Sequence, residues 1–165
     1  VIVVPADTTA EQIKEIAPDG IMFSNGPGDP SENTEVIKNI REIAQLGIPI
    51  FGICLGHQLM ALAHGATTQK LKYGHRGANQ PVIDKALGKT FVTSQNHGYA
   101  VVGESMDPEI GEVSHINAND GTCEGMRYKN INAFTVQFHP EAHGGPQDTA
   151  YLFDEFIDMI KKEMH

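Results

Sequence analysis

The feature that most constrains the fold is the apolar run "IPIFGI" at residues 48–53, which passes directly into a helical pattern. A strand in which almost every side chain is apolar must be covered on both faces. Such strands are typical of parallel sheets that carry helices on both sides. The run therefore predicts an α/β protein with a buried parallel sheet.

The N-terminal part of the chain continues this alternation of strands and helices. The expected strands cover residues 1–4, 19–24 and 48–53, and the expected helices cover residues 9–18, 34–47, 55–64 and 148–164. Beyond about residue 67, short strand-like runs between Gly, Asn and Asp residues indicate antiparallel hairpins or a meander. We expect one α/β domain over residues 1–165, with a central, mostly parallel sheet flanked by helices and additional antiparallel strands.

Charge and cysteine content exclude several classes of partner and location. The formal net charge of −9 argues against a nucleic-acid backbone or an anionic membrane surface as the main partner. No apolar stretch approaches the ~20 residues that span a bilayer, and no signal-peptide pattern is present. Cys54 and Cys123 share no sequence context. We therefore expect no disulfide framework and a reducing, cytoplasmic location.

Cys54 lies in "GICLG", where the apolar strand gives way to a helix. This is the thiol counterpart of the Gly-x-Ser-x-Gly turn, in which a nucleophile is raised above the end of a strand. Side chains at the flanking glycines would collide with neighbouring backbone in so tight a turn. The N–H groups and positive dipole end of the following helix would favour a thiolate over a thiol. The backbone N–H of Leu55 would point to where an oxyanion forms.

Two further segments hold groups that a cysteine nucleophile needs. A strand pattern ends at His139 in "FTVQFHPE", and Glu141 is close enough in sequence to hold the second ring nitrogen of the imidazole. The loop "SNGPGDP" at residues 24–30 follows the second expected strand. Its glycines permit close approach of a ligand, and Gly26 could present a second oxyanion N–H.

Together, these motifs resemble the class I (triad) glutamine amidotransferases, which hydrolyse the side-chain amide of glutamine. More narrowly, "GHRGANQPV", "SQNHGYAV" and "HPEAHGGPQD" are similar to the small, glutamine-hydrolysing subunit of carbamoyl-phosphate synthase. The resemblance covers essentially the whole chain. It implies the flavodoxin-like sheet of that family, and ammonia that serves carbamoyl phosphate synthesis in the pyrimidine or arginine pathway.

The resemblance also assigns roles to individual residues. Cys54 would be the nucleophile, His139 its base and later the acid, and Glu141 the group that orients the imidazole. The implied oxyanion donors are Gly26 and Leu55, and the implied glutamine-binding residues are Gly28, Gln58, Asn96, Gly98 and Tyr99. The implied partner is the large synthetase subunit, which uses ATP and Mg²⁺, so no cofactor or metal is expected in this domain.

The chain departs from the family pattern at several places. Gln80 stands where the family usually has His, and His143-Gly144 replaces a common Ser-Pro. The chain opens on "VIVVP" without Met. We therefore expect it to be part of a longer polypeptide. The chain given would then lack the N-terminal domain of the small subunit and the first strand and helix of the amidotransferase domain.

Other interpretations stay open. The same turn would serve an amidotransferase of another synthase, or a regulatory module without activity. His139 and His143, and Cys54 and His57, have possible metal-ligand spacings on a helix. Pro140 argues against a continuing helix there, and no further cysteine pair completes a zinc site.

The remaining histidines and the second cysteine are expected to have structural roles. His97 in "QNHGY" is expected to be a loop residue, and no function is indicated for His75 or His115. Cys123 has no helix start or base nearby in the sequence and is expected to be a partly buried thiol.

Overall fold

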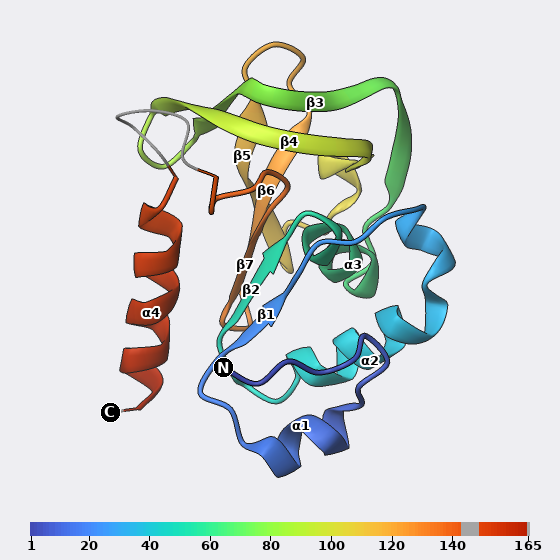
Figure 1. Ribbon diagram of the computed structural model, residues 1–165, viewed down its shortest axis with the longest axis vertical. Coiled ribbons are helices and arrows are strands. Elements are labelled where there is room, and N and C mark those ends of the chain that lie inside the picture. The colour runs from blue at the N-terminus through green and yellow to red at the C-terminus, as the bar shows by residue number, and fades with distance from the viewer. Residues whose placement is uncertain (143–148, 165) are drawn as a thin grey trace.

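A computed structural model describes residues 1–142 and 149–164 of the 165-residue chain. Its centre is one seven-stranded sheet with the strand order β1-β2-β7-β6-β5-β3-β4 (Figure 1). The strands are β1 (Ile21–Phe23), β2 (Ile50–Ile53), β3 (Thr68–Asp84), β4 (Lys89–Val101), β5 (Gly111–Asn117), β6 (Cys123–Tyr128) and β7 (Ala133–Val136). The helices are α1 (Ala10–Ile16), α2 (Thr34–Ala44), α3 (Leu55–Ala63) and α4 (Tyr151–Glu163), with short 3-10 turns at Pro30–Glu32 and Gly103–Ser105.

The sheet is mixed. β1, β2 and β7 pair in parallel, whereas β7, β6, β5, β3 and β4 pair antiparallel in that order. The predicted class of fold is therefore confirmed, with the parallel part limited to three strands. The long β3–β4 hairpin crosses the top of the molecule in Figure 1 and lies beyond the parallel strands.

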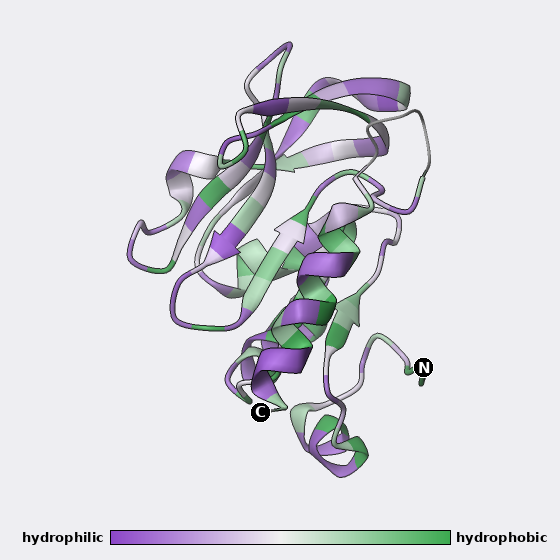
Figure 2. Cartoon of the chain, turned by 90° about the vertical axis from the view of Figure 1, so that its left-hand side faces the viewer, coloured by the Kyte–Doolittle hydropathy of each residue, from purple (hydrophilic) through white to green (hydrophobic). Residues whose placement is uncertain are grey.

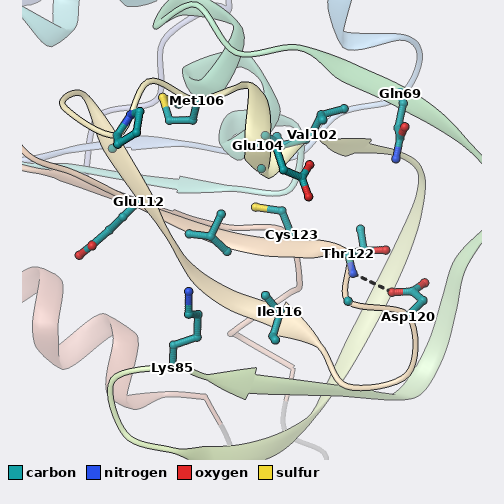
Figure 3. A pocket seen from close by; sticks show the side chains of 16 residues that line it. Gln69, Lys85, Val102, Glu104, Met106, Glu112, Ile116, Asp120, Thr122 and Cys123 are labelled. Carbon is teal, nitrogen blue, oxygen red and sulfur yellow. Dashed lines mark hydrogen bonds between the residues drawn. The ribbon is translucent and has the colours of Figure 1, made fainter.

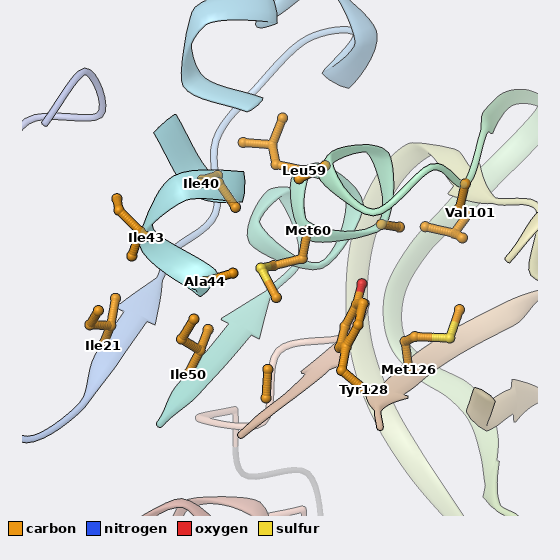
Figure 4. Close-up of a cluster of buried hydrophobic side chains, with 14 of the residues drawn as sticks. Ile21, Ile40, Ile43, Ala44, Ile50, Leu59, Met60, Val101, Met126 and Tyr128 are labelled. Carbon is orange, nitrogen blue, oxygen red and sulfur yellow. The ribbon is translucent and has the colours of Figure 1, made fainter. Parts of the chain in front are cut away.

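Helices cover both faces of the parallel strands, as the apolar run at residues 48–53 predicts. Ile50 packs in a core cluster with residues of α1, α2 and α3 (Figure 4). Its neighbour Phe51 faces the other way and joins the cluster under α4, where its ring stacks on Phe134 with a centroid distance of 4.5 Å. Figure 2, seen from the side of α4, shows hydrophilic residues along the outward face of that helix. The strand that carries Cys54 is thus held from both sides.

The prediction of a buried strand at residues 1–4 is wrong. The side chains of Val1, Ile2 and Val3 are exposed, and the segment has no strand geometry. A strand needs a paired neighbour, and β1, at the sheet edge, pairs only with β2 in the described part of the chain. An apolar run cannot form a buried strand where no neighbour takes up its hydrogen bonds.

None of the helices in the described residues is both long enough and apolar enough to cross a membrane.

Candidate active site

Cys54 occupies the turn between β2 and α3 with φ 54° and ψ −106°. Such a backbone conformation is unfavourable for a residue with a side chain, and it persists only where the surroundings enforce it. Two hydrogen bonds do so: the Cys54 N–H donates to the Val136 carbonyl at 2.9 Å, and the Cys54 carbonyl accepts from the Gln58 N–H at 3.2 Å. The strained strand-to-helix turn that the sequence predicts is confirmed.

The glycines on either side of Cys54 are required by packing. A Cβ atom at Gly52 would lie 2.8 Å from Thr135 Cγ2. A Cβ atom at Gly56 would lie 2.7 Å from Phe23 Cβ and against the Phe23 carbonyl. Real Cβ atoms essentially never approach so closely. The two glycines therefore let the first turn of α3 pack directly on β1 and β7.

The sulfur of Cys54 is buried, with 5 % of the residue exposed. Burial raises the pKa of the Cys54 thiol, while the Leu55 N–H and the Gln137 amide act in the opposite direction. The amide nitrogen of Gln137 donates to the sulfur at 3.6 Å. The Leu55 N–H at the helix start lowers the pKa of the thiol, as the sequence predicts, but desolvation outweighs it and the net shift of the pKa is upward. A separate group must take the thiol proton.

His139 and Glu141 follow the strand next to the one that leads to Cys54. β2 and β7 are parallel and Ile53 is in register with Val136, so both segments leave the sheet at the same edge. The His139 N–H donates to the Ser94 carbonyl at 3.0 Å, which ties the segment to β4. His139 Nδ1 lies 2.9 Å from Glu141 Oε1. A carboxylate only accepts, so Nδ1 carries a proton directed at Glu141.

The loop at residues 24–30 lies against the start of α3. A Cβ atom at Gly26 would lie 2.8 Å from Leu55 Cδ2, which places Gly26 against the side chain of Leu55. Gly28 has φ +96°, a conformation that glycine adopts at little cost. Asp29 accepts from the Ser31 N–H at 2.9 Å and so fixes the end of the loop. The oxyanion role of Gly26 and Leu55 stays a prediction.

Apart from Gly28 in the loop after β1, the predicted glutamine-binding residues come from α3 and β4. Gln58 is buried and donates to the Tyr99 carbonyl at 2.8 Å and to Gln137 Oε1 at 2.9 Å. Asn96 is exposed, and Gly98 and Tyr99 are half-buried on the same strand. The structure thus brings Gln58 and the β4 segment together, and their contacts with a substrate stay predictions.

Two surface pockets lie among the described residues, and one of them lies next to a predicted glutamine-binding residue. One, of about 470 Å³, is bordered by Tyr99 and by Asp29 and Ser31 of the loop after β1. The other, of about 620 Å³, lies among β3, β5 and β6 and is lined by Lys85, Cys123 and their neighbours (Figure 3). Only the first borders a predicted substrate-binding residue.

Gln137 is a site residue that the sequence reasoning missed. It is fully buried and bridges Cys54 and Gln58 through its amide. A polar residue inside the otherwise apolar run "FTVQF" was the available signal. A buried amide needs hydrogen-bond partners, and here both partners belong to the predicted site.

The metal-ligand spacings considered in the sequence do not form a site among the described residues. His57 is fully buried, its Nδ1 lies 2.7 Å from Thr135 Oγ1, and burial lowers its pKa to about 3. It is thus a neutral core histidine directed at β7. His143 lies outside the described residues, so the spacing of His139 and His143 is not tested.

Several known proteins are similar to this chain. The family model described as "Glutamine amidotransferase class-I" matches residues 1–159. A carbamoyl phosphate synthase small chain from Bacillus cereus is 57% identical over 161 residues, which are 98% of this chain and 44% of that protein. A small chain from Staphylococcus epidermidis is 59% identical over 162 residues, with the same coverage of 98% and 44%. The chain thus spans less than half the length of these curated relatives.

A solved structure shares the fold. The crystal structure of a candidate GMP synthase subunit from Thermoplasma acidophilum matches with a TM-score of 0.83 and 22% sequence identity. The match covers 98% of this chain and 81% of that one.

Proposed function

The chain belongs to the class-I glutamine amidotransferase family, and from this premise we propose that it hydrolyses the side-chain amide of glutamine to glutamate and ammonia. The observation that carries the proposal is the strained Cys54 turn at the sheet edge shared with His139 and Glu141. A nucleophile, a base and a group that orients the base are the minimum that amide hydrolysis through a covalent intermediate requires.

In the first step, His139 Nε2 takes the proton of Cys54, and the sulfur attacks the side-chain amide carbon. Glu141, bonded to Nδ1, holds the imidazole and stabilises its positive charge. Because burial raises the pKa of the thiol, the resting form favours the neutral thiol and the step needs a base. Gln137, which donates to the sulfur, holds the thiol in place before the attack.

The attack makes a tetrahedral centre with a negative oxygen. The N–H groups of Gly26 and Leu55 are proposed to stabilise this oxygen, and each such donor is typically worth about 10²–10³ in rate. The protonated His139 then gives its proton to the nitrogen, the C–N bond breaks, and ammonia leaves. A glutamyl thioester on Cys54 remains. Water, deprotonated by His139, attacks the thioester and releases glutamate and the free thiol.

Binding of the glutamine substrate is assigned to Gly28, Gln58, Asn96, Gly98 and Tyr99. Of these residues, Tyr99 borders the pocket of about 470 Å³, together with Asp29, Ser31 and residues of α3 and β3. The side chain of Gln58 supports the backbone of Tyr99 rather than pointing freely into solvent. Its contribution is therefore to position β4.

The similarity to carbamoyl phosphate synthase small chains supports a further part of the proposal. The ammonia passes to a large synthetase subunit, where ATP and Mg²⁺ are used for carbamoyl phosphate synthesis, and this domain needs no cofactor for amide hydrolysis. Residues 1–165 act as one glutaminase domain in this scheme. The net charge of −9 is compatible with a protein partner rather than a nucleic acid.

The chain offers a matched pair of cysteines for the test. Cys54→Ser is expected to lower glutamate release by at least about 10³-fold, because the thiolate is lost. Cys123→Ser changes the other buried thiol, whose sulfur donates to the Gly125 carbonyl, and is expected to keep the parent rate. Glutamate release is measured with and without a carbamoyl phosphate synthase large subunit. Parent-like release by Cys54→Ser would exclude the proposed nucleophile, and copurification with a different synthase would exclude the proposed partner.

A further inference from the structure

We propose that His75, His97 and Glu124 form a binding site for one divalent transition-metal ion, and that Zn²⁺ suits this set of donors best. The three residues come from three different strands, β3, β4 and β6. All three are buried, and one ligand atom of each lies within 4.8 Å of the others. The site adjoins the proposed glutamine-binding residues, because His97 lies between Asn96 and Gly98 and its Nδ1 lies 2.7 Å from the Tyr99 carbonyl.

The two distances from His75 Nδ1 to the other donor atoms are close to those around a tetrahedral ion. His75 Nδ1 lies 3.2 Å from His97 Nε2 and 3.2 Å from Glu124 Oε1. Metal–ligand bonds of about 2.0–2.1 Å in a tetrahedron place neighbouring donor atoms about 3.3 Å apart. The two histidines also face each other directly across the β3–β4 pair, so the sheet itself sets their separation.

An unpaired oxygen points to a ligand at this place. Glu124 is fully buried, and its Oε2 atom has no hydrogen-bond partner. Its Oε1 atom lies 3.2 Å from His75 Nδ1 and receives a long contact of 3.5 Å from Asn117. A buried carboxylate oxygen without a partner costs free energy that a bound cation would recover.

The hydrogen bonds of His97 create a second conflict that a cation would resolve. Its Nδ1 lies 2.7 Å from the Tyr99 carbonyl, and its Nε2 lies 2.8 Å from Gln95 Oε1. The orientation of the Gln95 amide is fixed, because its nitrogen donates to Thr93, whose hydroxyl donates to the Gln80 carbonyl.

A neutral imidazole has one N–H, so one nitrogen of His97 is left facing an oxygen without a proton between them. Burial lowers the pKa of His97 to about 4, which disfavours the doubly protonated ring. A metal ion on Nε2 lets Nδ1–H bond to Tyr99 and gives Gln95 Oε1 a cation to contact.

The second ring nitrogen of His75 is hydrogen-bonded to a carboxylate, as is typical of histidines that bind metals. Its Nε2 lies 2.7 Å from Asp120 Oδ2, and the carboxylate fixes the proton on Nε2 and turns Nδ1 toward the site. Without a metal, the hydrogen bond to Glu124 raises the pKa of His75 to about 9, so metal binding displaces the Nδ1 proton. Asp120 is half-exposed and lines the pocket of about 620 Å³ (Figure 3), so this partner of His75 lies next to solvent.

The experiment uses the chain without a histidine tag and in a Cys54→Ser background, which removes the reactive thiol as a competing ligand. After treatment with a chelator, Co²⁺ is titrated and then displaced with Zn²⁺. We expect one equivalent per chain, the visible absorption of tetrahedral Co²⁺ without a thiolate charge-transfer band, and a rise of Tm with Zn²⁺ concentration.

Three variants make the assignment specific. Asp120→Asn, at a half-exposed position that the fold tolerates, is expected to weaken Zn²⁺ binding by about 10–100-fold. His75→Gln removes a direct ligand and is expected to weaken it further. His64→Gln removes a histidine outside the cluster and is expected to bind like the parent.

The proposal is overturned if the parent chain takes up no metal at micromolar concentrations. It is also overturned if Asp120→Asn binds as tightly as the parent, or if a thiolate band assigns the ion to Cys123.

Discussion

Replacement of Gly56 by Ala tests the requirement for a bare backbone after the nucleophile. At an ordinary helix position, Gly→Ala stabilises by about 1 kcal/mol because alanine is the better helix former. At Gly56 the new methyl group would lie 2.7 Å from Phe23 Cβ and 2.8 Å from its carbonyl carbon. Both atoms belong to Phe23 of β1 and lie in or next to its backbone. They therefore cannot move aside by a rotation of the side chain.

The steric term is expected to outweigh helix propensity. Overpacking of a well-packed region costs about 1–3 kcal/mol, and a clash with strand backbone belongs near the upper end. After about 1 kcal/mol of propensity gain is subtracted, the variant is expected to lose about 2 kcal/mol. At about 2–4 °C per kcal/mol for a chain of this size, Tm falls by about 4–8 °C. The shift of α3 also moves Cys54 and Leu55, so glutamine hydrolysis falls.

Thermal unfolding and glutamate release measure the two effects on the same preparation. Gly47→Ala serves as the control, because a Cβ atom there meets nothing within 4 Å although φ is +80°. Gly47→Ala is expected to lose only the about 1–2 kcal/mol that an alanine costs in a left-handed backbone conformation, and to keep the activity of the parent protein. A Gly56→Ala variant that unfolds at or above the parent Tm with full activity would refute the reasoning.

The remaining predictions concern the site and the core. Gln137→Leu removes the donor to Cys54 and the acceptor for Gln58, and is expected to lower glutamate release by about 5–30-fold, measured at saturating glutamine. His57 is neutral in the folded chain, where burial lowers its pKa to about 3. Because His57 takes up its proton near pH 6.5 in the unfolded chain, the free energy of unfolding falls as the pH is lowered from 6.5 towards 3. In denaturant titrations His57→Gln should flatten that slope by about 1.4 kcal/mol per pH unit, and an unchanged slope would contradict the assignment. Phe51→Ala should cost about 3–5 kcal/mol by the same method, against under about 1 kcal/mol for the exposed Met22→Ala.

The features predictable from the sequence are those in which local pattern and tertiary packing agree. The run at residues 48–53 is apolar throughout because Ile50 and Phe51 face two different helical layers. Gly52 and Gly56 could be understood as steric requirements of the turn before any contact was known. The turn at Cys54 therefore followed from the sequence together with its place at a strand end.

Other features depend on neighbours that the sequence does not name. The apolar run at residues 1–4 has strand composition, yet it pairs with no strand in the described part of the chain. The raised pKa of Cys54 reflects its burial, which local sequence does not measure. His75, His97 and Glu124 lie on three strands and meet only through the order β6-β5-β3-β4 of the sheet. Spacing along the chain does not reveal such a cluster.

The central claim is that Cys54 forms a covalent intermediate with glutamine. The most direct measurement is to mix the chain with glutamine, stop the reaction with acid, and determine the masses of its cysteine-containing peptides. The account predicts a glutamyl adduct on the peptide that contains Cys54, which disappears in Cys54→Ser and builds up when hydrolysis of the thioester is slowed. An adduct on the Cys123 peptide, or turnover of glutamine with no adduct on Cys54 at any time, would contradict it.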